Sequence, residues 1–350
     1  MITKYKQFIN EGSSPQKWKL KKSLEKLGIG RGHNYTISDD GKVNVEGDVF
    51  IRDDFYNLYG IKFGRIDGDF KLSSKCVNGL DGCPVHVEGE FDCSDQNLTS
   101  LEGCPDYVGG SFNCGQNRLT DLIGGPTTVI GSYDCMSNNL SSLLGAPEKV
   151  GKFDCSENWL ESLEHGPKLV TDGSYWCDSN QLVNLDGIAQ GIDYSLHCDW
   201  NNLTTLRGCP EKLKGEFRID NNKLTSLEGC PQYIGDDLLA NNNLLTSLKG
   251  GPKVFGGLNY FFKDNPITSL EGGPESYSDK SLPIFINCPV SDVYHLFESF
   301  EALSLLNEWE VIDGDDMTVS YTRLCEVYEA LGEHVPERDE FKFDKYKLID

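Results

Sequence analysis

A short pattern returns about every 21 residues through most of this chain. It consists of an aromatic residue, a cysteine two positions later, then an asparagine, two leucines three positions apart and a proline. A stretch of this length cannot bury its own apolar side chains, so it is stable only when it stacks on copies of itself. The repeat therefore predicts a solenoid. The clearest copies are residues 91–105, 112–126 and 133–147.

The aromatic position marks about a dozen coils. Residues two apart in an extended segment point to the same side, so we expect the aromatic and cysteine columns to face the core and the residue between them to face outward. The coils begin at Val49, Phe70, Phe91, Phe112, Tyr133, Phe153, Tyr175, Leu196, Phe217, Leu238 and Tyr260, with Ile284 as a degenerate last start.

The asparagine column has a mechanical explanation. Where the chain leaves each strand, its backbone polar groups turn toward the core, and a buried amide side chain can satisfy them and bond to the neighbouring coils. We therefore interpret these residues as structural. They are Asn117, Asn138, Asn158, Asn180, Asn201, Asn222, Asn243 and Asn265, and the same place is taken by Asp54, Lys75 and Gln96 in the first three coils.

A short apolar-x-apolar strand, then x-x-N-x-L and a further leucine, resembles the leucine-rich repeat over residues 45–290. The resemblance implies a parallel β-sheet on a concave face and a role as a protein–protein interaction scaffold. The short period and the closing proline resemble the short-repeat proteins that bacteria use as effectors. Cys and Phe in the strand, and a glycine two residues ahead of it, depart from that pattern and resemble repeat proteins encoded by large tailed bacteriophages.

The thirteen cysteines follow the repeat. A free thiol at an inward strand position behaves as a small hydrophobe, so we expect packed, reduced cysteines there. A one-sided column cannot surround a tetrahedral metal ion, and we expect neither a metal nor a cofactor. The inward cysteines are Cys93, Cys114, Cys135, Cys155, Cys177 and Cys198, while Cys83, Cys104, Cys209 and Cys230 precede turn prolines.

The chain changes character on both sides of the repeats. Residues 13–44 predict a cap made of a basic amphipathic helix over 14–27 and a hairpin that turns at Asp39-Asp40-Gly41. Residues 291–350 predict a helical cap, with Ser291 as an N-cap and a second helix over 320–331. The fold class is thus an α+β repeat, a solenoid with helical caps at both ends, because an uncapped coil would expose its apolar cross-section.

Residues 1–12 carry a second resemblance. MITKYKQFINEG is similar to the capsid-targeting leader of internal head proteins in T-even-type phages, which a protease removes by cutting after Glu. Ile9, Glu11 and Gly12 match that processing site. The alternative, an ordinary exposed tail, stays open. The leader lacks the apolar stretch of a secretory signal peptide.

The net charge of −23 restricts the partners. Residues 1–33 carry a local charge of +6, which leaves −29 for the rest of the chain. Such a body repels phosphates, so we expect no direct nucleic-acid binding. It would permit imitation of DNA, which remains an alternative. No apolar run is long enough to cross a bilayer.

The sequence does not predict an enzyme. Cys325 lies among Leu324, Val327 and Tyr328 on a helical pattern, as a packed cap residue would, and a lone His334 nearby does not indicate a catalytic pair. Residues 291–350 are also much shorter than the ubiquitin-ligase domain that follows the repeats in some effectors.

Outward residues of the central coils form the candidate partner-binding surface. Exposed tryptophans are costly in water and, with arginine, dominate interface energetics, and a rim of aspartates would favour a basic patch on the partner. The alternative is that some of these rings cover a ragged core. The candidates are Trp176, His197, Trp200, Arg218, Trp159, Asp178, Asp199 and Asp220.

Together these features predict a phage-encoded binding protein that grips a host protein and inhibits or redirects it, with an anti-defence role as one such outcome. It would act in the host cytoplasm and, if the leader is genuine, be packaged in the capsid interior and injected. A structural virion component, a DNA mimic and a bacterial effector remain alternatives. The identity of the partner and the oligomeric state stay open.

Overall fold

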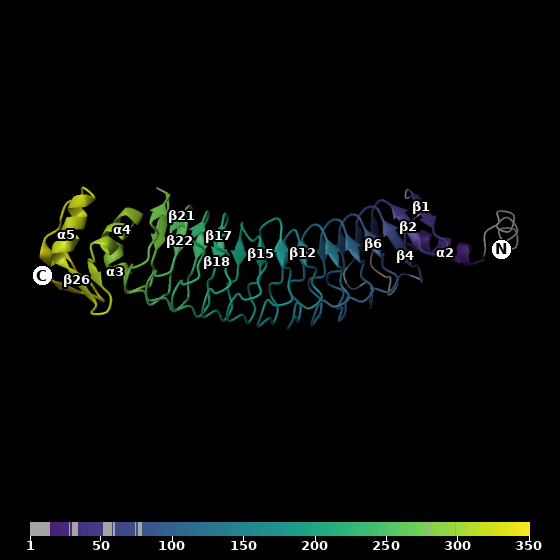
Figure 1. The fold of residues 1–350 in the computed structure, drawn as a ribbon, viewed down its shortest axis with the longest axis horizontal. Coiled ribbons are helices and arrows are strands. Elements are labelled where there is room, and N and C mark those ends of the chain that lie inside the picture. The colour runs from purple at the N-terminus through teal and green to yellow at the C-terminus, as the bar shows by residue number, and fades with distance from the viewer. Residues whose placement is uncertain are drawn as a thin grey trace. The chain divides into compact units, whose positions relative to one another are not determined.

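The computed structural model describes residues 15–350 except for residues 28, 30–33, 52–57, 59, 74, 76–78, 279 and 298. The chain divides into two compact units. Unit 1 runs to Asp154 and includes His165–Pro167, and unit 2 comprises Cys155–Glu164 and Lys168–Asp350. Each unit is a stack of coils with short strands, visible as successive arrows in Figure 1.

Each coil adds one short strand to a parallel ladder, which we call the first ladder. In unit 1 Tyr133 pairs with Phe112 and Phe153, and in unit 2 Leu196 pairs with Tyr175 and Phe217. The predicted parallel solenoid is therefore confirmed. The strands of unit 1 are β3 (Val49–Ile51), β5 (Phe70–Leu72), β7 (Phe91–Asp92), β9 (Phe112–Asn113), β11 (Tyr133–Asp134) and β13 (Phe153–Asp154). Those of unit 2 are β15 (Tyr175–Trp176), β16 (Leu196–His197), β18 (Phe217–Arg218), β20 (Leu238–Leu239), β22 (Asn259–Phe261) and β24 (Leu282–Ile284).

A second set of short parallel strands, which we call the second ladder, precedes the first-ladder strand in most coils, and it was not predicted from the sequence. Its strands in unit 1 are β2 (Val43–Glu46), β4 (Phe63–Ile66), β6 (His86–Val87), β8 (Tyr107–Val108), β10 (Thr128–Val129) and β12 (Lys149–Val150). In unit 2 they are β14 (Leu169–Val170), β17 (Lys212–Leu213), β19 (Tyr233–Ile234), β21 (Val254–Phe255) and β23 (Ser276–Tyr277). The second ladder is interrupted, since among the described strands β10 is not paired with β12 or β14 with β17. Most of the described coils therefore contain two strands instead of one, whereas the coil that begins at Leu196 has only an isolated bridge at Gln190 in this place.

In most coils a glycine lies two residues ahead of the aromatic position of the first-ladder strand, in the turn between the two ladders, whereas Tyr194, Asp236 and Leu258 take this place in other coils. A Cβ atom at Gly131 would lie 2.8 Å from the carbonyl carbon of Gly110, and one at Gly110 would lie 2.7 Å from that of Gly89. The Gly131 amide also donates to the Gly110 carbonyl at 2.9 Å. Glycine is present because the backbones of successive coils approach too closely for any side chain.

The core consists of the inward columns. Phe112 and Cys114 are both fully buried, as are Leu119 and Leu122, and the ring of Phe91 stacks on that of Phe70 at 5.6 Å between centroids. The predicted burial of the aromatic and cysteine columns is thus confirmed. Later coils place Ile219, Ala240 and Phe262 at the cysteine position, all fully buried.

The asparagine column forms the predicted ladder. Asn138 accepts a hydrogen bond from the Leu119 amide at 3.0 Å and donates to the carbonyls of Cys114, Cys135 and Met136 at 3.1 to 3.2 Å. One side chain therefore joins its own loop to that of the preceding coil. The same bonds recur at Asn117, Asn180, Asn201, Asn222, Asn243 and Asn265.

The residue before each asparagine has a positive φ, which turns the chain inward. Ser137 has φ 53° and Asp95 has φ 51°. Gln96, as predicted, takes the asparagine place and bonds to Asn117. The Lys75 amide bonds to the Asp95 carbonyl, as the Asn180 amide bonds to the Trp200 carbonyl, although Lys75 itself has a positive φ of 54°. Asp54 lies outside the described residues.

The last coil begins one residue earlier than predicted. Pro283, not Ile284, pairs with Tyr260, and the buried residues are Pro283 and Phe285. Ile284 pairs with Phe261 and faces outward. Proline has no amide hydrogen, so Pro283 offers no donor for a further strand, which suits the end of a ladder.

Unit 1 begins with the predicted helix and hairpin. Helix α2 (Pro15–Lys26) buries Leu24 and leaves Trp18 39% exposed beneath the Lys22 ammonium. Strand β1 (Asn34–Ile37) pairs antiparallel with β2, and β2 continues into the second ladder by pairing with β4. The hairpin therefore starts the second ladder instead of the first.

Unit 2 ends in helices and a small sheet. The helices are α3 (Ser291–Tyr294), α4 (Phe300–Glu308) and α5 (Tyr321–Ala330), with the 3-10 turn η1 (Arg338–Glu340). Ser291 is the first residue of α3 and not its N-cap, whereas Ser299 and Ser320 cap α4 and α5 by accepting amide hydrogen bonds. The sequence analysis missed the sheet of β25 (Ile312–Asp313), β26 (Thr318–Ser320) and β27 (Lys347–Ile349).

The asparagine ladder yields a stability prediction. Asn138→Ala should lower the free energy of unfolding by about 2 to 4 kcal/mol, because the Leu119 amide and several carbonyls lose their partner in the core. The neighbouring Asn139 is exposed, so Asn139→Ala should change it by less than about 0.5 kcal/mol. Urea denaturation of both variants measures the difference, and equal losses would contradict a special role for the ladder.

Candidate functional site

One outward row of unit 2 crosses four successive strands. Trp176 pairs with His197, His197 with Arg218, and Arg218 with Leu239. Phe261 continues the row on β22. The strand alternation turns these side chains away from the buried aromatic column, and each is half-buried. We call Trp176, His197, Arg218, Leu239 and Phe261 the strand row.

The polar members of the strand row are joined through Glu216. The His197 Nε2 atom lies 3.3 Å from Glu216 Oε2, and the Arg218 Nε atom lies 2.9 Å from Glu216 Oε1. Pairing with Glu216 raises the pKa of Arg218. The sequence analysis did not single out Glu216, although its position two residues before Arg218 places it on the same face of the strand. The Trp176 ring meets the His197 ring edge to face, at 6.0 Å between centroids.

A second row lies beside the first, where the chain leaves the strands. Asp178, Asp199 and Asp220 hold the third place after the aromatic position in successive coils, and Asn241 and Lys263 hold it in the next two. We call the three aspartates the carboxylate row. Burial raises the pKa values of Asp199 and Asp220, and the charge of Asp220 raises that of Asp199 further.

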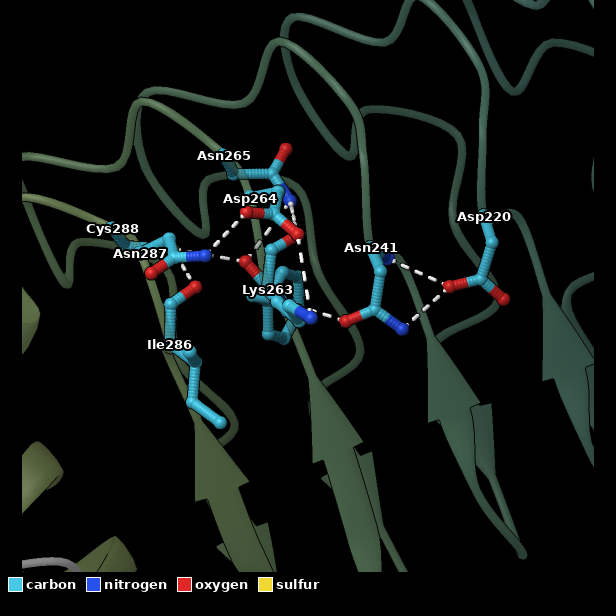
Figure 2. Close-up of polar contacts among 9 residues, drawn as sticks. Asp220, Asn241, Lys263, Asp264, Asn265, Ile286, Asn287 and Cys288 are labelled. Carbon is cyan, nitrogen blue, oxygen red and sulfur yellow. Dashed lines mark hydrogen bonds and ion pairs between the residues drawn. The ribbon is translucent and has the colours of Figure 1, made fainter.

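Figure 2 shows how the carboxylate row is fixed at one end. The backbone and side-chain amides of Asn241 both donate to Asp220 Oδ1, at 2.8 and 2.6 Å. The Lys263 amide donates to Asn241 Oδ1 at 2.8 Å. The side chains of Asp220 and Asn241 and the backbone amide of Lys263, on three successive coils, thereby form one chain of hydrogen bonds.

The three tryptophans occupy three different columns of the repeat. Trp176 lies on strand β15, Trp200 directly follows the carboxylate row at φ 52°, and Trp159 follows the asparagine column two coils earlier. The expectation that these rings form one anchor stays a prediction. Trp200 and Trp159 are 61% and 62% exposed, so neither ring covers the core. Trp176 is half-buried.

Unit 1 carries its own outward row, which is acidic. Asp92, Asn113, Asp134 and Asp154 lie side by side on β7, β9, β11 and β13. Burial, opposed by a hydrogen bond from the Met136 amide and assisted by the charges of Asp154 and Asp92, raises the pKa of Asp134 to about 6. Asn113 makes the equivalent bond to the Gly115 amide at 2.9 Å.

The repeat cysteines are packed thiols. Burial raises the pKa values of Cys177 and Cys198 well above their usual value, so both are protonated near neutral pH and are weak nucleophiles. Within the described ranges, no three His, Cys, Asp or Glu residues are placed to hold a metal ion. Cys325 is half-buried on α5.

Two other expectations concern the leader and membrane-spanning helices. Ile9, Glu11 and Gly12 lie outside the described residues, so the leader remains a sequence-based expectation. None of the described helices is both long and apolar enough to cross a bilayer.

Asp134 predicts a pH dependence of stability. Its folded-state pKa of about 6 exceeds the ordinary value of 3.8. Between these pH values the folded protein keeps a proton that the unfolded chain releases, and this proton stabilises the fold. The stabilisation is lost as the pH rises through about 6. Asp134→Asn keeps the acceptor for Met136 and should stabilise the protein at pH 7.5 by roughly 2 kcal/mol, with little effect at pH 4.

Thermal or urea unfolding at both pH values tests this expectation. Asp106→Asn, at an exposed position of unit 1, controls for the removal of one negative charge. If both variants change stability equally at pH 7.5, the effect comes from net charge and not from the burial of Asp134.

Comparison with known proteins adds a structural likeness. No protein-family model matches the chain, and no curated protein matches it. Among solved structures, YopM from Yersinia enterocolitica WA-314 is similar, with a TM-score of 0.43 and 15% sequence identity. The likeness covers 65% of this chain and 58% of that one, less than two thirds of its length. The repeat, the first ladder and the asparagine column of this chain resemble those of a leucine-rich-repeat solenoid.

Proposed function

We propose that the protein is a protein–protein interaction scaffold that binds its partner through the outward face of the first ladder in unit 2. The observation that carries the proposal is the strand row, in which Trp176, Arg218, Leu239 and Phe261 are held in register and half-buried. Aromatic and arginine side chains fixed on a rigid sheet lose little conformational freedom on binding, and they are the residues that dominate interface energetics.

Trp200 supports the same surface. A ring that is 61% exposed beside Asp199 gains more than an already covered ring when a partner excludes water from it. The pair of Arg218 and Glu216 adds a charge arrangement that would orient the partner more than it would strengthen binding.

We further propose that the chain is a phage protein whose partner is a host protein, which it inhibits or redirects. This proposal is supported by the sequence resemblance of the repeat and of residues 1–12 alone. On the same basis, we propose cleavage after Glu11, packaging in the capsid interior and action in the host cytoplasm after injection.

The binding surface is tested by variants assayed for partner capture. Affinity capture from bacterial lysate with the intact protein identifies a stoichiometric partner. Trp200→Asn and Arg218→Ala should then each weaken its binding by about 2 kcal/mol. Asparagine holds the Trp200 place in the next two coils, at Asn221 and Asn242, with the same positive φ, so the melting temperature should stay nearly constant.

Trp159→Ala is the matched control, because its ring is equally exposed but lies in another column and two coils away. If capture survives Trp200→Asn and Arg218→Ala but is lost in Trp159→Ala, the binding surface lies elsewhere than proposed. Lower melting temperatures with unchanged capture would make these side chains structural.

The leader is tested separately. Mass spectrometry of virions from a producing phage should find a protein that begins at Gly12. Detection of the Met1 form in infected cells, together with its absence from particles in either form, would contradict packaging.

A further inference from the structure

The outward face of the first ladder in unit 2 carries two parallel rows of different chemistry. The strand row presents aromatic and aliphatic side chains, and its charges are compensated internally because Glu216 contacts both His197 and Arg218. The carboxylate row presents one aspartate per coil, and Asp220 is bonded to the neutral amide of Asn241. One face therefore offers three large apolar side chains, Trp176, Leu239 and Phe261, interrupted by the His197 and Arg218 pair, next to a negative strip.

We propose that this face is the docking surface for an amphipathic helix of the partner, which carries Lys or Arg residues opposite the carboxylate row and apolar residues opposite the strand row. The inference rests on the function proposed above and names the chemistry of the partner.

The spacing of the coils favours a helix over an extended segment. Adjacent parallel strands lie about 4.8 Å apart, so the three aspartates span roughly 9.6 Å. Residues i and i+4 of a helix are neighbours at about 5 to 6 Å, and residue i+7 lies about 10.5 Å along the axis. Residues on the same side of an extended strand are about 6.7 Å apart, so a strand laid along the aspartates would fall out of register with them by roughly 2 Å per coil.

The charge of the surface favours basic residues at those places. Asp199 and Asp220 are already partly removed from water, and burial disfavours their charged forms more than the nearby Arg218 charge favours them, so that both pKa values are raised. A positive side chain from the partner would oppose that effect, whereas a negative one would add to it. The hydrogen bonds from Asn241 hold Asp220 in position before binding, so little ordering is required there (Figure 2).

The carboxylate row also limits how many turns of the partner helix can carry basic residues. Its fifth place is Lys263, whose ammonium lies 3.8 Å from Asp264. Four coil steps separate Asp178 from Lys263, roughly 19 Å, which corresponds to about 13 residues of helix. The partner helix should therefore carry its basic residues within about two turns and none opposite Lys263.

Two synthetic peptides of about 20 residues test the proposal with the intact protein. The stripe peptide carries Lys at positions i, i+4 and i+7 beside a leucine face. The isomer has the same composition and helicity, with the three lysines distributed around the helix. Fluorescence anisotropy should give a Kd at least about tenfold lower for the stripe peptide, and the difference should shrink in high salt.

The double variant Asp199→Asn/Asp220→Asn should abolish this difference while the protein stays folded, as checked by its melting temperature. Glu211→Gln/Glu228→Gln is the matched control, since both glutamates are exposed in unit 2 and lie outside the two rows. This double substitution removes the same amount of negative charge. It should retain the preference for the stripe peptide.

Equal affinity for the two peptides, no binding of either, or a preference that survives Asp199→Asn/Asp220→Asn would each overturn the inference. Failure here is distinguishable from failure of the proposed function. A host protein that still requires Arg218 and Trp200 but binds the double aspartate variant normally would leave the scaffold in place and exclude the basic helix.

Discussion

The structure depends on one interaction, the satisfaction of each coil's backbone polar groups by the next coil. A chain that turns inward every 21 residues or so buries amides and carbonyls that no local helix could pair. The asparagine column resolves this, because one side chain such as Asn138 serves both its own loop and the loop before it. The positive φ of the preceding residue, Ser137 in that coil, aims the chain inward so that the amide can reach its partners. Without the ladder, neither the buried aromatic column nor the strand register would be stable.

Stacking converts positions in the repeat into rows on the surface. In each unit, a residue's neighbours across the ladder are its equivalents one repeat away, so the chemistry of a row is set by what occupies one repeat position. The same position gives an acidic row in unit 1, where Asp134 meets Asp154, and an aromatic and basic row in unit 2, where Trp176 meets His197. The two units thus share one architecture and present different chemistry.

The acidic rows show that the architecture tolerates electrostatic strain. Carboxylates on adjacent strands lie about 5 Å apart and are partly desolvated, which raises the pKa of Asp134 to about 6. The hydrogen bonds and apolar burial of the coils hold them there. Such carboxylates locally destabilise the free protein, and a complementary positive surface on a partner would reduce this destabilisation.

The sequence by itself determined the solenoid, the inward columns and the role of the asparagines, because each is dictated by a period that repeats residue by residue. It also placed Trp176, His197 and Arg218 in one row, since strand alternation is local. Only the tertiary structure decided the second ladder, the shift of the last coil to Pro283, the terminal sheet of unit 2, the bridging role of Glu216 and the exposure of the Trp159 and Trp200 rings. These depend on how closely neighbouring coils approach and which loop positions bend. A pattern read along one chain contains no measure of either.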